Sequence, residues 1–262
     1  MSLTVAALLA ALERLVPARL AAPWDNSGLQ VGDPRAEVSR VLVALDATPD
    51  TIGEATTRGC QALVAHHPLI LEPIKRIGLH EPLGRAIGDA VRHGVAIVAA
   101  HTNYDSVPWG VSQVLAERLG LEDTVPLQPL NDSGEGLGRV GTLPRPLSLA
   151  ELAALARQRL GTTGLRYVEG PGRPIRRVAV CGGSGMSLAE AALAAGAEAF
   201  VTGDVRYHQA RAYEGRLAVI DCGHFAGETP ALEPLAAAIR RELPGLAEVT
   251  VCQREQDPFK SD

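Results

Sequence analysis

The sequence predicts an α/β protein made of two interlinked, topologically similar lobes, and three observations lead to this fold class. Short apolar runs of the kind found in buried strands alternate with helix-like amphipathic stretches along the chain. One strand–helix–strand pattern occurs twice, and histidine or carboxylate residues follow the ends of several predicted strands. With 262 residues, the chain is long enough for one large domain or two small lobes.

The composition is that of a globular protein, with 46% hydrophobic and 21% charged residues. No apolar run reaches the length of about 18 residues that a membrane-spanning helix needs. Residues Met1–Val5 show no basic region leading into an apolar stretch, as a signal peptide would. We therefore expect a cytoplasmic protein without a membrane partner.

Charge and cysteine usage exclude two further classes of protein. The net charge is -5 and aromatic residues make up 3% of the chain, with no basic stripe that carries interleaved aromatics. A nucleic-acid partner is therefore not expected. The four cysteines are widely separated and form no CxxC pair, which argues against a disulfide framework or a cysteine-based zinc site.

The first half of the chain begins with a predicted helix over Leu3–Leu15, where leucines recur at helical spacing. A loop rich in Pro, Asp, Asn and Gly follows from Pro23 to Pro34. The continuous apolar run Val41–Leu45 is typical of a strand buried in a parallel sheet. Further elements of this half are a helix that begins near Thr48 or Asp50 and ends at Gly59, a strand at Ala62–Ala65, a helix at Leu83–His93, a strand at Val95–Ala100 and a helix at Gly110–Leu119.

The second half follows a stretch from Asn131 to Gly138 that is rich in Gly, Asp and Ser, and we expect this stretch to link the two halves. A helix is predicted near Leu147–Leu160. Residues Gly182–Gly185 fit two interpretations, a phosphate cradle at a helix N-terminus or a plain strand–helix turn. The polar tail Arg254–Asp262 is expected to be frayed.

An internal repeat links the two halves. Arg40–Val43 recurs as Arg177–Val180, 137 positions later. At the same offset Gly59 matches Gly196, and Ala62 matches Ala199. This match predicts a duplicated βαβ unit, although two unrelated βαβ units could also have converged on it.

Polar residues that could bind metal follow four of the predicted strands. Ligands of open α/β sheets bind beyond the carboxyl ends of strands, so these side chains can converge. They are His66 and His67 after one strand, His101 and Asp105 after another, His208 beyond a third, and His224 after a fourth.

The residue types suit a pair of metal ions. Neutral imidazole together with carboxylate favours Zn, Mn, Fe or Co. Three histidines and two carboxylates can fill two sites if one carboxylate bridges two ions, and ions about 3.5–4 Å apart can share a hydroxide for attack near neutral pH. Simpler interpretations stay open for single residues, because Asp105 could be a turn or cap residue, and His224 and Glu228 could be in helix-terminal contacts.

Motifs along most of the chain resemble the GTP cyclohydrolase I type 2 family, also called the Nif-three-like dinuclear-metal family. The sequence is similar to that family in seven motifs that occur in the family's order. They are Trp24–Gly32, Leu45–Thr48, His66–Leu69, His101–Asp105, Gly136–Gly141, Thr202–His208 and Gly223–Glu228.

The resemblance implies specific roles for the site residues. His67 and Asp105 would hold one divalent ion, His66 and His224 the other, and Glu228 would bridge the two. The ions would be Zn, Fe or Mn. His101 and His208 would lie close by, either as proton-transfer residues or as structural hydrogen-bond partners. Two positions depart from the family pattern, because Asp204 stands where the family often has Glu, and Gly227 where it often has Ser.

The resemblance also implies an architecture. The family has two α/β lobes with the metals between them, and it assembles as a ring-shaped homohexamer. We expect the first lobe to span residues 1–130 and the second residues 131–262, without the inserted middle domain of longer family members.

Three functions follow as expectations. The family name implies that a metal-bound hydroxide attacks the guanine ring of GTP or of a similar small substrate. A phosphoesterase or an amidohydrolase could use the same metal centre. A ring that binds metal or serves as a scaffold, without being an enzyme, is the third reading.

Overall fold

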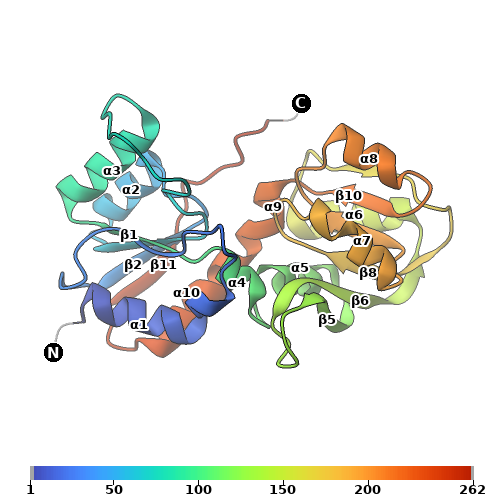
Figure 1. The fold of residues 1–262 in the computed structure, drawn as a ribbon, viewed down its shortest axis with the longest axis horizontal. Helices are drawn as coiled ribbons and strands as arrows, with labels where there is room; N and C mark the ends of the chain where they lie inside the picture. The colour runs from blue at the N-terminus through green and yellow to red at the C-terminus, as the bar shows by residue number, and fades with distance from the viewer. Residues whose placement is uncertain (1–2, 261–262) are drawn as a thin grey trace. The chain divides into compact units, whose positions relative to one another are not determined.

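The computed structural model describes residues 3–260 and divides the chain into two compact units (Figure 1). Unit 1 comprises the residues up to Tyr104 together with Leu232–Gln256. Unit 2 comprises Asp105–Ala231 together with the residues from Asp257 onward. The mixed α/β class with two sheets is thus as predicted.

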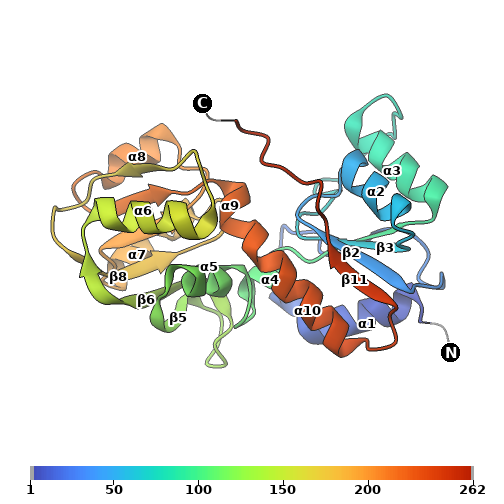
Figure 2. The same ribbon diagram turned by 180° about the vertical axis from the view of Figure 1, so that it is seen from behind.

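Unit 1 contains a five-stranded sheet in the order β1-β4-β3-β2-β11. All neighbouring strands are parallel except β1, which runs antiparallel to β4. Figure 2 shows how the chain returns through α10 and β11 to lie beside β2. The strands are β1 (Gly28–Val31), β2 (Arg40–Ala44), β3 (Ala62–Ala65), β4 (Ala96–Ala99) and β11 (Glu248–Val251).

Helices cover both faces of this sheet, because its central strands are apolar on both sides. Helices α2 and α3 pack on one face through residues such as Ile52 and Ala90, and α1 and α10 lie on the other. Thr48 caps α2 through a capping box with Thr51. The helices of this unit are α1 (Val5–Leu15), η1 (Ala18–Leu20), α2 (Pro49–Thr57), α3 (Pro82–His93) and α10 (Leu232–Glu242), and α4 (Thr102–Ser106) crosses into unit 2.

Unit 2 contains a six-stranded sheet in the order β5-β6-β8-β9-β10-β7. Strands β8, β9 and β10 are parallel, and the outer strands pair antiparallel with them and with each other. The strands are β5 (Glu122–Pro129), β6 (Gly136–Leu147), β7 (Arg166–Val168), β8 (Ile175–Val180), β9 (Ala199–Thr202) and β10 (Ala218–Asp221).

Successive side chains of these strands point to opposite faces of the sheet and contribute to two hydrophobic cores. Val178 belongs to the core under α5 and α6, whereas its neighbour Ala179 belongs to the core under α7. The helices of this unit are α5 (Val111–Leu119), α6 (Leu149–Leu160), η2 (Met186–Leu188), α7 (Ala189–Ala194), α8 (Tyr207–Tyr213), α9 (His224–Glu228) and η3 (Thr229–Ala231).

The predicted repeat is present in the register of the two sheets. Val41 pairs with Ala62 in unit 1, and Val178 pairs with Ala199 in unit 2, at the same 137-residue offset. In each sheet a third parallel strand, β4 in unit 1 and β10 in unit 2, lies beside this pair. On its other side lies a short antiparallel strand, β1 in unit 1 and β7 in unit 2. The two units therefore share a four-stranded core, as the similar-lobe prediction requires.

The units divide the chain differently from the expected boundary at residue 130. The stretch around Asn131 is the turn of the β5–β6 hairpin inside unit 2, where Pro129 pairs with Gly136. The chain also crosses back, because β11 pairs with β2 of unit 1. Among the described helices, none combines the length and the apolar character that crossing a membrane requires.

Candidate metal centre

Three histidines of unit 1 lie at the carboxyl ends of two neighbouring parallel strands. His66 and His67 directly follow β3, and His101 follows β4. One ring nitrogen from each of the three lies within 4.8 Å of the others. The sheet register explains this, because β3 and β4 are adjacent and parallel, with Ala65 opposite Ala99.

Each of these rings is held through its Nδ1 atom. The Nδ1–H of His66 donates to the backbone carbonyl of Ala100 at 2.8 Å. The Nδ1–H of His67 donates to the Asp46 carboxylate at 2.8 Å, and that of His101 donates to Asp25 at 2.8 Å. Metal-binding histidines commonly have this arrangement, because it fixes the tautomer in which Nε2 carries a lone pair.

Asp25 is the most firmly held of these partners. Its carboxylate accepts hydrogen bonds from the hydroxyls of Ser27 (2.8 Å) and Thr102 (2.5 Å), and from the Thr102 backbone N–H (3.1 Å). Burial alone would raise the pKa of Asp25, but the bonds from His101, Thr102 and Ser27 outweigh it and hold that pKa well below its usual range. Asp25 is therefore ionised and orients the His101 ring.

Unit 2 contributes a histidine–carboxylate pair on the short helix α9. His224 Nε2 lies 3.0 Å from Glu228 Oε2. The Nδ1–H of His224 donates to Asp204 at 2.7 Å, as the unit 1 histidines donate to their partners. Asp204 has a φ of 54°, a left-handed conformation that non-glycine residues seldom adopt. Such backbone strain is typical of residues at functional sites.

The glycine loop after β8 packs directly against this pair. A Cβ atom on Gly183 would lie 2.1 Å from Glu228 Oε1 and 3.2 Å from His224 Nε2. Gly183 also has a φ of +58°, so a side chain is excluded on two grounds. The structure favours the strand–helix turn interpretation of Gly182–Gly185, because the loop forms the wall of the His224–Glu228 pair and the helix that follows, α7, has only six residues.

Asp105 lies on the same side of unit 2 as Glu228. Burial, together with the nearby charges of Asp105 and Glu228, raises the pKa of the Cys181 thiol to about 12. Cys181 immediately follows β8, so both carboxylates lie near the carboxyl end of that strand. The thiol stays protonated at neutral pH and is not a ready metal ligand.

His208 does not join these groups. It is exposed on α8, where its ring contacts that of Tyr207 with centroids 5.3 Å apart. Among the described residues, it belongs to no group of three or more potential metal ligands that lie within 4.8 Å of one another. At the other departure from the family pattern, a Cβ on Gly227 would meet no atom closer than 3.6 Å, so there is room for the Cβ of the serine that the resemblance leads us to expect.

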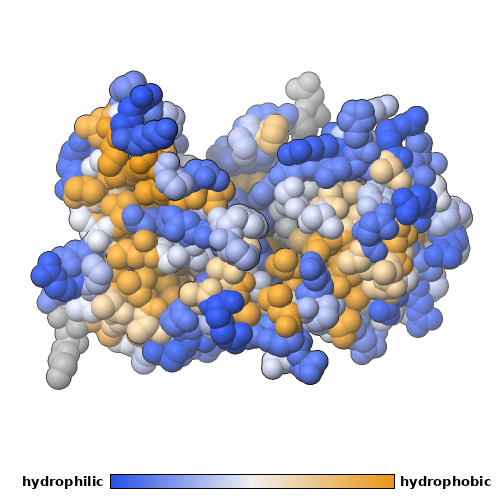
Figure 3. Space-filling model, in the orientation of Figure 1, coloured by the Kyte–Doolittle hydropathy of each residue, from blue (hydrophilic) through white to orange (hydrophobic). Residues whose placement is uncertain are grey.

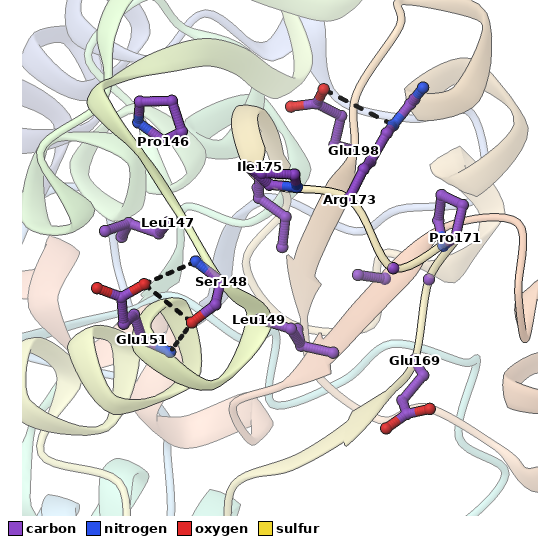
Figure 4. A pocket seen from close by; sticks show the side chains of 14 residues that line it. Pro146, Leu147, Ser148, Leu149, Glu151, Glu169, Pro171, Arg173, Ile175 and Glu198 are labelled. Atoms are coloured by element: carbon purple, nitrogen blue, oxygen red, sulfur yellow. Dashed lines mark hydrogen bonds and ion pairs between the residues drawn. The ribbon is translucent and has the colours of Figure 1, made fainter.

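A separate cavity of about 620 Å³ lies in unit 2, beside the start of α6 (Figure 4). Most of its charged side chains have a partner in the cavity wall. Glu151 accepts the Ser148 hydroxyl and N–H, and Arg173 lies 3.8 Å from Glu198. No histidine or cysteine is among its described lining residues, so it lacks the imidazole and thiolate ligands that zinc and iron prefer.

The donors fit a divalent transition metal better than calcium or magnesium. Four imidazole rings are held through Nδ1 by a carbonyl or a carboxylate, and carboxylates lie beside them. Imidazole with carboxylate suits Zn, Fe or Mn, whereas calcium and magnesium prefer all-oxygen sites. The sequence identified the histidines but not the pairing of these histidines with Asp25, Asp46 and Asp204, although all three aspartates fall inside motifs noted above.

Comparisons with known proteins agree with the resemblance seen in the sequence. A family model described as Duf34/NIF3 (NGG1p interacting factor 3) matches residues 3–258. A Streptomyces coelicolor protein named GTP cyclohydrolase 1 type 2 homolog is 42% identical over 240 residues, covering 88% of this chain and 84% of its own. A Clostridium perfringens protein of the same name is 33% identical over 252 residues, covering 95% and 96%.

Solved structures show the same fold. The chain matches a Staphylococcus aureus hypothetical protein with a TM-score of 0.94 at 27% identity, covering 100% of both chains. It matches a Bacillus cereus protein related to NIF3 with a TM-score of 0.93 at 25% identity, again covering 100% of both.

Proposed function

Because the chain belongs to the Duf34/NIF3 family, we propose that it is a cytoplasmic metal-dependent hydrolase that acts on a GTP-like small molecule. In this proposal it binds two divalent ions, Zn, Fe or Mn. The proposed ligands are His66, His67, Asp105, His224 and Glu228.

One observation carries the proposal. His66, His67, His101 and His224 each donate Nδ1–H to a fixed oxygen, which puts the ring lone pair on Nε2 in all four. In the proposal that lone pair binds metal at His66, His67 and His224 and accepts a proton at His101. A set of core histidines would not need the same tautomer in four places. When bound, the ions would lower the pKa of a coordinated water and so supply a nucleophile near neutral pH.

Trp24 is suited to hold a planar substrate. Its side chain is 63% exposed, and its ring lies edge-on to His101 with centroids 5.8 Å apart. An exposed indole beside a polar site offers a stacking surface for a purine base. This position supports the substrate that the relatives' name indicates, because their name refers to GTP.

His101 is the proposed proton-transfer residue next to the substrate. Its ring is 17% exposed and lies between Trp24 and the metal-binding histidines of unit 1. The ionised Asp25 keeps its Nδ1 protonated, so its Nε2 is the atom that would accept a proton. His208 is retained as the second proton-transfer candidate through the family resemblance alone.

The substrate assignment is tested with protein loaded with Zn, Fe or Mn in turn. We expect GTP to release formate, and we expect His101→Gln to slow this release while leaving the metal content unchanged. Turnover of phosphoesters or amides instead of GTP would point to the alternative hydrolase. Full metal loading without turnover of any tested substrate would favour the hypothesis of a non-enzymatic metal-binding or scaffold ring.

Trp24 is tested by fluorescence. The chain has two tryptophans, so Trp109→Phe leaves Trp24 as the single indole. We expect GTP to quench this fluorescence, and we expect Trp24→Ala to weaken GTP binding about 5- to 150-fold, the range that corresponds to a stacking energy of about 1–3 kcal/mol. Unchanged fluorescence and affinity would remove Trp24 from the binding site.

We also propose that the chain forms the hexameric ring implied by the family. Figure 3 shows hydrophobic residues at the α3 end of unit 1. Between residues 71 and 91, the exposed large hydrophobic residues are Leu71, Ile74, Ile77, Leu79 and Val91, at 37–67% exposure. Contiguous exposed apolar surface commonly marks a protein–protein interface. Sedimentation equilibrium tests this, and a monomer at all concentrations would contradict it.

A further inference from the structure

The C-terminal segment after β11 is fixed to unit 1 rather than frayed over its whole length. The backbone N–H of Cys252 donates to the Val43 carbonyl at 2.8 Å. The buried carboxylate of Glu54 then accepts the N–H groups of Gln253 (3.1 Å) and Arg254 (3.0 Å). Burial and the Glu54 carboxylate raise the pKa of the Cys252 thiol to about 11, so this thiol stays protonated and donates to Glu54 at 3.1 Å.

These contacts place Glu255 over the carboxyl end of β2. One oxygen of its carboxylate accepts the backbone N–H of Leu45 at 2.8 Å, and the other accepts that of Asp46 at 2.7 Å. A carboxylate that receives two backbone N–H groups fixes the orientation of that backbone. The tail of the chain therefore determines the position of a turn more than 200 residues earlier.

The turn leads directly to a histidine of the proposed metal site. The side chain of Asp46 accepts the Nδ1–H of His67 at 2.8 Å, and the Leu45 carbonyl accepts the His67 backbone N–H at 2.8 Å. The Thr51 hydroxyl donates to the Asp46 carbonyl at 2.8 Å. Asp46 is thus held on its N–H side by Glu255 and on its carbonyl side by Thr51.

We propose that Glu255 is a positioning residue for the metal site: it holds Asp46 in place, and through Asp46 it orients the His67 ring. This role rests on the proposed metal-binding function, in which His67 is a ligand. It assigns a task to the C-terminal segment that lies outside every motif noted in the sequence. Outer partners of this kind typically change metal affinity about 10- to 100-fold when they are lost.

The first test uses metal-free protein labelled with ¹⁵N at histidine. In the wild type we expect His67 in the Nδ1–H tautomer, with His67→Gln identifying its signals. In Glu255→Ala we expect a mixture in which the Nε2–H tautomer is also populated. Glu255→Gln keeps one acceptor oxygen and should lie between the two. Because this measurement needs no metal, it decides the positioning role even if the wild type binds none.

The second test measures metal affinity by competition with a chelator. We expect Glu255→Ala to bind Zn²⁺ about 10- to 100-fold more weakly, with Glu255→Gln less affected. Glu248→Gln is the matched control, because Glu248 lies on the preceding strand β11 and pairs with Arg58 instead (3.1 Å). The control should resemble the wild type in both tests.

The outcomes distinguish the positioning role of Glu255 from the proposed metal site. A wild-type tautomer and wild-type affinity in Glu255→Ala would overturn the positioning role. Wild-type protein that takes up no metal, but whose His67 tautomer depends on Glu255, would overturn the metal-site proposal and keep the positioning role. If Glu255→Ala does not fold, the same comparison is made with Glu255→Gln.

Discussion

Units 1 and 2 use the same four-stranded core but distribute their polar residues differently over it. At the 137-residue offset, His67 of unit 1 corresponds to Asp204 of unit 2, and Asp46 corresponds to Gly183. Unit 1 forms two aspartate–histidine pairs, Asp46 with His67 after β2 and β3, and Asp25 with His101 after β4. Unit 2 forms its pair after β9 and β10, as Asp204 with His224.

The repeated scaffold fixes the positions from which side chains leave the sheet, but not the residue types at those positions. The register of parallel strands fixes where side chains emerge beyond the sheet, and that is the same in both units. The units differ after β3 and its equivalent β9, which are followed by His67 and Asp204, whereas β4 and its equivalent β10 both lead to a histidine, His101 and His224. Where unit 2 has Gly183 in place of an acid, the freed space is filled by Glu228 from α9.

The largest effect expected from this comparison is the loss of either aspartate. Asp46→Asn and Asp204→Asn should each weaken metal binding about 10- to 100-fold, because the ring of His67 or His224 loses its charged acceptor. Chelator competition measures this. An effect from only one of the two would break the equivalence of the pairs.

A smaller effect is expected at Gly183. Gly183→Ala should destabilise unit 2 by about 1–3 kcal/mol through overpacking against Glu228, beyond the cost of a left-handed alanine. Gly215→Ala is the control, since Gly215 also has a positive φ, +73°, but no atom lies within 4 Å of the added Cβ. Urea unfolding compares them. Equal losses would mean that Glu228 gives way without cost.

The contribution of Glu54 to the stability of the folded protein is expected to depend on pH. Burial would raise the pKa of Glu54, but hydrogen bonds from Cys252, Gln253, Arg58 and Arg254 outweigh it and lower that pKa. The resulting stabilisation is present above the ordinary glutamate pKa of about 4.3 and is lost as the pH falls through the lowered value. Glu54→Gln should therefore be less stable than the wild type at neutral pH.

The difference between wild type and Glu54→Gln should narrow as the pH is lowered below about 4. Denaturant midpoints at several pH values measure this. A difference that does not depend on pH would show that the Glu54 charge contributes nothing to holding the C-terminal segment.

Much of the fold could be predicted from the sequence because its central strands are continuous apolar runs. Strands β2, β3 and β4 and the helices between them were anticipated by such runs and by Gly94 as a helix end. Strands β5 and β11 were not, because β5 is largely exposed and contains Pro126, and β11 is a short edge strand. Without β11, the return of the chain to unit 1 could not be foreseen.

The candidate ligands could be proposed from their places after strands, but their partners could not. Asp25 lies 76 residues from His101, and Asp204 lies 20 residues from His224. Local periodicity does not detect such distant pairs. Glu255 lies about 210 residues from the turn that it holds, in a polar tail whose composition predicted fraying.

The central claim is that the histidines and carboxylates at these strand ends bind metal. Elemental analysis of protein purified without added metal, beside Glu228→Ala and His67→Ala, tests it most directly. We expect close to two metal ions per wild-type chain and a clear loss in both variants, with circular dichroism unchanged. Variants that keep two ions would contradict the ligand assignment. A wild type that binds none, even after incubation with Zn, Fe or Mn, would contradict the metal centre itself.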